Sequence, residues 1–190
     1  MKTTTISIAA LLTGLAALAA PTAAQAKHDR VYAQLLAYDS APDRATLQTA
    51  AAPAQAEAAL MEIHGDPARA MVIRLRALDA LGLFPSLAVR GYLHRLTTDT
   101  DADAVHRMRA ATALVHAYGD GALTSIRPVM HDPKADDDLK VAIADALVRY
   151  AGPAGRDLVR KASVAQKDPA RMDAMDRVLL PQENPTPLIR

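Results

Sequence analysis

Apolar residues recur along the chain at the three- and four-residue spacing of one helical face. The stretch from Val72 to Leu81 has this pattern, which returns from Val105 to Tyr118 and from Leu139 to Tyr150. Acidic, turn-forming residues precede each stretch, where they can cap a helix N-terminus and oppose its dipole. The pattern therefore predicts three helices over these ranges.

A second helix is predicted after each of these three. The second helices run from Ser86 to Thr97, from Ala122 to Met130 and from Ala154 to Ala165. Pro128 removes a backbone hydrogen bond to Thr124 and predicts a kink in the middle one. A glycine follows each first helix, and we expect it to end that helix in a left-handed conformation. These glycines are Gly82, Gly119 and Gly152.

The three helix pairs form an internal repeat. An Ala-Leu pair recurs at 80–81, 113–114 and 146–147, an offset of about 33 residues. Aliphatic and basic residues recur with the same offset, and we call each set of equivalent positions a column. Chance matches in an alanine-rich chain explain a single column but not several independent ones. We therefore predict an all-α fold, an α-solenoid of antiparallel helix pairs with a period of about 33 residues.

Weaker copies of the pattern flank the three clear repeats. Helices are predicted at 43–51 and 54–64, after an N-terminal helix at 29–37, and a partial unit follows at 169–180. A solenoid presents a different face where stacking stops, so we interpret both ends as degenerate caps. The proline-spaced segment 181–190 is predicted to be an extended tail.

The N-terminal segment 1–26 has the layout of a secretory signal peptide. Lys2 precedes an uncharged, mostly apolar run from Ile6 to Ala20, and an Ala-Gln-Ala sequence ends at Ala26. The alternative is a membrane anchor, but this run is shorter than the roughly 20 residues that span a bilayer. We expect cleavage after Ala26, a periplasmic or secreted solenoid domain at 27–180, and no membrane insertion after cleavage.

The repeats contain the spacing Arg-x-x-Ala-x-x-Ala-Leu after an acidic turn. It is complete at 74–81 and 107–114, where Gly119-Asp120 follows, and partial at 140–147. This unit resembles short HEAT repeats of the type that also occurs in phycobilisome-lyase-like proteins. The resemblance covers about residues 43–180 and implies an α-solenoid that binds other macromolecules. It implies no lyase activity here, because the chain has no Cys to hold a chromophore and no catalytic position matches.

Composition and charge exclude some kinds of site and partner. The chain has 42 Ala among 190 residues, one Phe, five Tyr, and neither Cys nor Trp. The lack of Cys excludes disulfides and Cys-based metal sites. Loss of Lys2 with the signal peptide reduces the 22 Lys and Arg to 21, equal to the 21 Asp and Glu. Phosphate binding normally requires a basic excess, so we expect no nucleic-acid partner.

Two basic columns hold the candidate functional residues. One lies on the first helices and is interpreted as an inter-repeat structural ladder that pairs with the preceding aspartates. It consists of Arg74, Arg107 and Lys140. The other, the basic strip, lies on the second helices, which line the concave face in solenoids that resemble this one. It is either a groove for an acidic peptide, phosphate or polyanion, or a solvated face paired with nearby acids. It consists of Arg90, His94, Arg127, Arg156 and Arg160.

Metal and catalytic motifs are incomplete. Residues 99–103 open like a calcium loop, but Ala104 stands where that loop needs Gly and Ala110 where it needs Glu. We interpret these acids, and those at 136–138, as helix caps. The chain contains no H-E-x-x-H sequence, nucleophile elbow or phosphate loop. We predict no metal, no cofactor and no catalytic residue.

The histidines give no zinc site by their spacing. His106 and His116 lie on one predicted helix, about 15 Å apart by helical rise, too far for one zinc ion. The sequence therefore predicts an exported, non-catalytic HEAT-like repeat protein, a scaffold or adaptor for a protein or acidic peptide. One alternative is an envelope hydrolase or metal-dependent enzyme on a helical-repeat scaffold. The other is a structural or assembly subunit.

Overall fold

The computed structural model describes residues 22–37, 42–166 and 168–180, and over these ranges the chain is helical, without a strand. This confirms the expected all-α class. Most of the predicted signal peptide and the predicted tail at 181–190 lie outside the described residues. No helix in the described ranges is both long and apolar enough to cross a membrane.

The helices begin and end close to the positions that the sequence pattern predicts. The largest departure is at α1, which begins at Ala23 instead of Asp29 and so crosses the predicted cleavage point after Ala26. In chain order the elements are α1 (Ala23–Leu36), α2 (Arg44–Ala50), α3 (Pro53–Gly65), α4 (Met71–Leu81), α5 (Leu87–Thr98), α6 (Ala104–Tyr118), the 3₁₀ helix η1 (Gly119–Ala122), α7 (Leu123–His131), α8 (Asp137–Tyr150), α9 (Gly152–Val164) and α10 (Pro169–Leu179).

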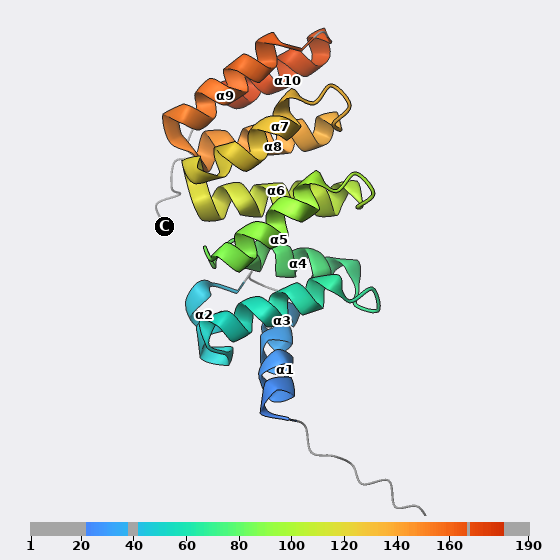
Figure 1. Cartoon of the computed structure of the whole chain (residues 1–190), viewed down its shortest axis with the longest axis vertical. Helices are drawn as coiled ribbons and strands as arrows, with labels where there is room; N and C mark the ends of the chain where they lie inside the picture. The colour runs from blue at the N-terminus through green and yellow to red at the C-terminus, as the bar shows by residue number, and fades with distance from the viewer. Residues whose placement is uncertain (1–21, 38–41, 167, 181–190) are drawn as a thin grey trace, which may run out of the picture.

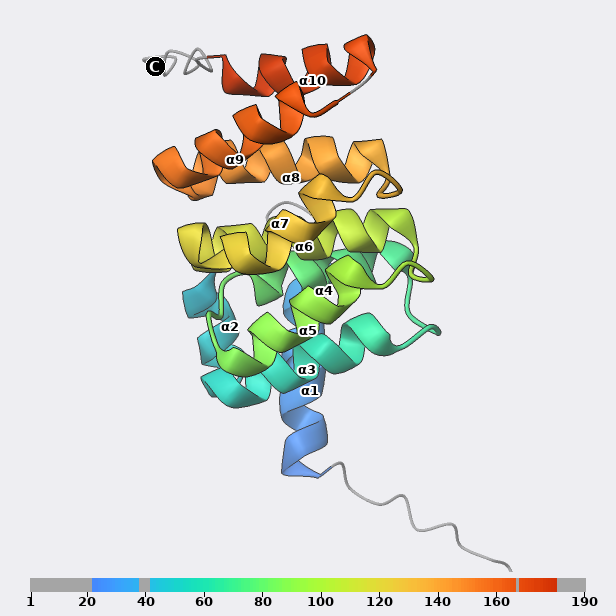
Figure 2. The ribbon, with the colours of Figure 1, turned by 45° about the horizontal axis from the view of Figure 1, so that its top comes forward.

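The helices are stacked along the long axis of the molecule, from α1 at one end to α10 at the other (Figure 1). Helices α4, α6 and α8 contact one another in succession, while α3 packs on α4, α5 on α6 and α9 on α8. Figure 2 shows α3, α5, α7 and α9 in front of the layer that contains α4, α6 and α8. The second helix of each pair therefore lies on one side of the molecule.

The core is one continuous cluster that extends through the stack. Its small members include Ala80, Ala113 and Ala146, which are at most 3% exposed, and the leucine after each of them is fully buried. Because an alanine side chain is small, helices of successive layers approach closely and still fill the space between them. This packing explains why the chain contains so much alanine.

Aspartates order the turns before the first helices at repeated positions. Asp66, Asp99 and Asp132 each accept a hydrogen bond from the backbone N–H two residues later, at 2.9, 3.0 and 2.8 Å. Asp103 and Asp136 accept N–H bonds from the first turns of α6 and α8. The interpretation as N-terminal caps is confirmed for Asp103 and Asp136, whereas Asp66, Asp99 and Asp132 order the turn before the helix.

Two of the three predicted left-handed glycines are confirmed. Gly119 has φ 55° and Gly152 has φ 59°. Gly82 is different: its φ is −59°, and its N–H bonds to the Asp79 carbonyl in a tighter turn. A Cβ at Gly82 would lie 3.2 Å from the His116 ring, so glycine there serves the close approach of α4 and α6. Helix α7 continues through Pro128 to His131.

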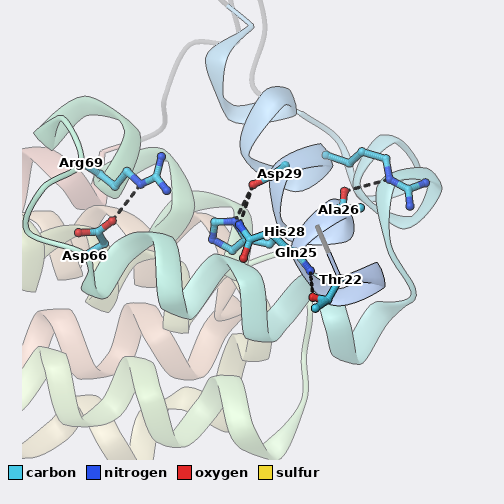
Figure 3. A network of polar contacts seen from close by, with 8 residues as sticks. Thr22, Gln25, Ala26, His28, Asp29, Asp66 and Arg69 are labelled. Atoms are coloured by element: carbon cyan, nitrogen blue, oxygen red, sulfur yellow. Dashed lines mark hydrogen bonds and ion pairs between the residues drawn. The ribbon is translucent and has the colours of Figure 1, made fainter. Parts of the chain in front are cut away.

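Arginines attach α1 to the rest of the stack. The Arg76 guanidinium donates to the carbonyls of Leu35 and Ala37, at 2.8 and 3.0 Å, and so caps the C-terminus of α1. Arg69, in the turn between α3 and α4, lies 4.3 Å from the centre of the Tyr32 ring and 3.0 Å from Asp66. Figure 3 shows Arg69 and Asp66 facing each other beside α1.

Candidate binding surface and cavity

The basic column on the first helices does not act as the predicted ionic ladder. Arg74 Nε donates to the His64 carbonyl at 2.8 Å, and Arg107 Nε donates to the Thr97 carbonyl at 3.4 Å. These carbonyls lie in the last turns of α3 and α5, where the helix dipole favours a cation. Neither arginine forms an ion pair with a carboxylate of the described residues, because the nearby aspartates bond to their own turns. Through these bonds Arg74 joins α4 to α3, and Arg107 joins α6 to α5.

Lys140, the third member of the column, behaves differently. Its side chain is 3% exposed and makes no hydrogen bond or ion pair with any residue that the structure describes. It lines a cavity of about 430 Å³ between the ends of α7 and α9, the side of α8 and the start of α10. The basic column therefore ends in a lysine whose side chain is mostly buried and whose ammonium group faces this cavity.

The basic strip is divided by the structure. Arg90 donates to the Gly121 carbonyl at 2.6 Å, and its guanidinium lies 5.5 Å from the centre of the Tyr118 ring. His94 is half-buried, and its Nδ1 atom is buried without a hydrogen-bond partner among the described residues. The contacts of Arg90 tie α5 to the junction of α6 and η1. These two residues belong to the packing of the stack.

The other three members of the strip are exposed on α7 and α9, which pack against each other. With Lys161, they form what we call the cationic patch: Arg127, Arg156, Arg160 and Lys161. Asp157 lies among them and bonds to Lys161 at 2.7 Å. That hydrogen bond lowers the pKa of the Asp157 carboxyl, and the charges of Arg160 and Arg127 lower it further. The patch thus carries four cations around one carboxylate.

A shallow hollow of about 230 Å³ lies within the cationic patch. Its apolar wall comes from Leu123, Ala154 and Leu158, and its charged rim includes Arg127 and Lys161. His131, at the end of α7, lines both this hollow and the cavity at Lys140. The two features are therefore neighbours at the C-terminal end of the stack.

Sequence reasoning missed a buried histidine pair between α3 and α6. The rings of His64 and His106 have centroids 5.1 Å apart, and His64 Nδ1 lies 2.5 Å from the Tyr92 hydroxyl. Both Nε2 atoms are buried and have no partner among the described residues. His116, which we compared with His106, instead packs its ring on Tyr150.

Burial keeps this histidine pair neutral. It lowers the pKa of His64 to about 4, and the charges of His106 and Arg74 act in the same direction. Burial also lowers the pKa of His106. The repeat period offered a signal for the burial of His64 alone, since this residue stands in the column of the buried Thr97 and Met130. Within the described part of the chain, no group of three or more His, Asp or Glu side chains is placed to hold a metal ion.

Comparison with protein-family models finds none that matches this chain, and comparison with curated proteins finds none that matches it either.

Proposed function

We propose that this chain is an exported, non-catalytic α-solenoid of HEAT-like helix pairs, with a period of about 33 residues, that acts as a scaffold or adaptor. In this proposal the cationic patch binds an acidic segment of a protein or peptide. The observation that carries it is the exposure of Arg127, Arg156 and Arg160 on neighbouring second helices. Their arginine forks suit carboxylates, and the single nearby carboxylate already bonds to Lys161.

The arrangement of the helices supports the solenoid part of the proposal. Each of α4, α6 and α8 packs on the next, and the equivalent residues Leu60, Leu93 and Ile126 are all fully buried in the second helices. At the C-terminal end, α10 buries Met175 and exposes Asp173 and Arg177. A charged outer face of this kind suits a terminal cap better than a stacking surface.

The packing of α1 is compatible with export and cleavage after Ala26. The buried residues of α1 are Val31 and Leu35, and the carbonyls that Arg76 caps also follow this point. Residues 22–25 are exposed. Cleavage would therefore remove the first turn of α1 and leave the contacts that attach this helix to the stack.

The test is charge reversal in the cationic patch. A fluorescein-labelled deca-glutamate peptide is titrated with the mature chain, and binding is followed by fluorescence anisotropy at several salt concentrations. Arg127→Glu combined with Arg160→Glu should weaken binding at least tenfold, and binding to the unchanged protein should decrease with added salt. Arg149→Glu, on the exposed side of α8, is the matched control and should bind as before. Unaltered binding in the double variant, or none by the unchanged protein, would exclude this patch as an acidic-peptide site.

A further inference from the structure

The cavity at Lys140 has the size of a small-molecule site. Its volume is about 430 Å³, within the range of pockets that hold small ligands. Met130, Pro133 and Ala162 supply apolar walls, and charged groups come from α8 and from the start of α10. The cavity lies apart from the arginines of the cationic patch and shares only His131 with the hollow there.

The ammonium group of Lys140 is the unusual feature of this cavity. At the two equivalent positions, Arg74 and Arg107 use Nε to bond a carbonyl ten residues earlier in the chain. In lysine the atom at that point of the side chain is the Cε carbon, which cannot donate, and the charge lies one bond farther out. Nζ faces the cavity and has no hydrogen-bond or ion-pair partner among the described residues, so it is free to bind a ligand anion.

The charges around Lys140 favour a monoanion. Arg171 forms ion pairs with Asp137 at 2.7 Å and with Asp168 at 3.0 Å, so its guanidinium is already paired, and the three groups together carry one negative charge. Asp168 also accepts the backbone N–H of Ala170. Among the described Lys and Arg residues that line the cavity, Lys140 is the one without an ion-pair partner. A carboxylate with a short aliphatic body matches both this charge and the apolar walls.

We propose that the cavity between α7, α8, α9 and α10 binds a small organic carboxylate through Lys140. The carboxylate accepts hydrogen bonds from Nζ, and the aliphatic part packs against Met130 and Ala162. The carboxylate belongs either to a free small acid or to the C-terminus of a peptide. This proposal goes beyond the acidic-peptide function and does not depend on the cationic patch.

The experiment is a titration of the isotopically labelled mature chain followed by ¹H–¹⁵N chemical shifts. Hexanoate should saturate at about 1 mM, as expected for a ligand with this few atoms, with shifts at residues 130–133, 140 and 162–171. Hexanamide, the neutral isostere, should not saturate. Acetyl-Ala-Leu with a free carboxylate or a terminal amide shows whether a peptide C-terminus fits. Tighter binding of hexyl phosphate than of hexanoate would contradict the preference for a monoanion.

Two variants test the role of Lys140. Lys140→Met should weaken hexanoate binding at least tenfold while the thermal midpoint changes little, because methionine keeps an apolar stem in place of the buried part of the lysine and no ion pair is lost. The same substitution at Lys134, which is exposed on the turn before α8, should change neither hexanoate binding nor the thermal midpoint. Ala165→Phe adds a ring at an exposed position of the cavity wall and should also block binding without unfolding the chain.

Three results would overturn the proposal. They are the absence of saturable binding by any carboxylate probe, hexanoate binding that survives Lys140→Met, and equal binding of hexanoate and hexanamide. A failure here is distinguishable from a failure of the acidic-peptide function. Hexanoate binding should survive reversal of Arg127 and Arg160, and deca-glutamate binding should survive Lys140→Met.

Discussion

Acidification should destabilise this fold through His64. The side chain is 5% exposed, and burial lowers its pKa from 6.5 to about 4. In the unfolded chain His64 has its ordinary pKa, so between these values the unfolded state binds more protons than the folded state. Stability is therefore complete above about pH 6.5 and decreases as the pH falls towards 4. The neighbours that oppose protonation are His106 and Arg74, while Tyr92 bonds the Nδ1 atom.

The size of this effect follows from the two pKa values. Proton linkage for a single group with these values gives a loss of roughly 2 to 3 kcal/mol between pH 7.5 and 4.5. That is a large share of the stability of an ordinary domain, which is about 5–15 kcal/mol. The folded chain keeps Asp43, Asp66 and Asp157, whose pKa values are lowered, mostly ionised at pH 4.5. Burial raises the pKa of Asp79, and its proton uptake in the folded state opposes the loss from His64.

The assay is urea unfolding followed by far-ultraviolet circular dichroism at pH 7.5, 6.5, 5.5 and 4.5. The free energy of unfolding of the unchanged protein should decrease by roughly 2 to 3 kcal/mol between pH 7.5 and 4.5. His64→Met, which introduces the residue found at position 130 of the same column, should lose much less. His131→Gln is the control, because His131 is exposed at the end of α7 and its replacement should leave the profile unaltered. Parallel profiles for the unchanged protein and His64→Met would refute the assignment of the acid sensitivity to His64.

Two further predictions concern the packing of the stack, and both are measured as the free energy of urea unfolding at pH 7.5. Gly155→Ala should destabilise the fold by about 1–3 kcal/mol, because its Cβ would lie 2.5 Å from the Leu147 carbonyl oxygen. Gly91→Ala, whose Cβ would meet only the Arg95 side chain at 3.6 Å, should be neutral or stabilise the fold by up to about 1 kcal/mol. Leu114→Ala should cost about 3–5 kcal/mol because Leu114 is fully buried between layers, and a loss below about 1 kcal/mol would contradict the burial of this column.

The helices were predictable because each carries its own apolar pattern, and several also begin at a side-chain cap. Ser86 was expected at the start of a helix, and it caps α5 by accepting the N–H of Val89. The conformation of Gly82 was predicted wrongly, because a glycine can follow a helix for two reasons. Either its φ is positive, or a close neighbour leaves no room for a Cβ. The neighbour at Gly82 is His116 on α6, which sequence spacing within one pair does not show.

The polar contacts were harder to predict because they join helices of different pairs. His64 and His106 lie on α3 and α6, and their separation along the chain is not a multiple of the repeat period. Comparison of histidines along one helix therefore missed the contact. The basic column shows the same limit: its positions were found from the period, but the period does not show that Arg74 and Arg107 bond carbonyls instead of carboxylates.

Departures from the repeat also shape the proposed acidic-peptide site. Leu123 stands in the column of Arg90 and Arg156, and its side chain forms part of the apolar wall of the hollow in the cationic patch. A uniformly acidic segment would leave this wall without a matching group. In the proposed site, a segment in which an apolar residue separates acidic ones would place its carboxylates on Arg127 and Arg156 and its apolar side chain on Leu123. Since specificity is a difference of affinities, the interruption at Leu123 would select among acidic partners that the arginines alone attract equally.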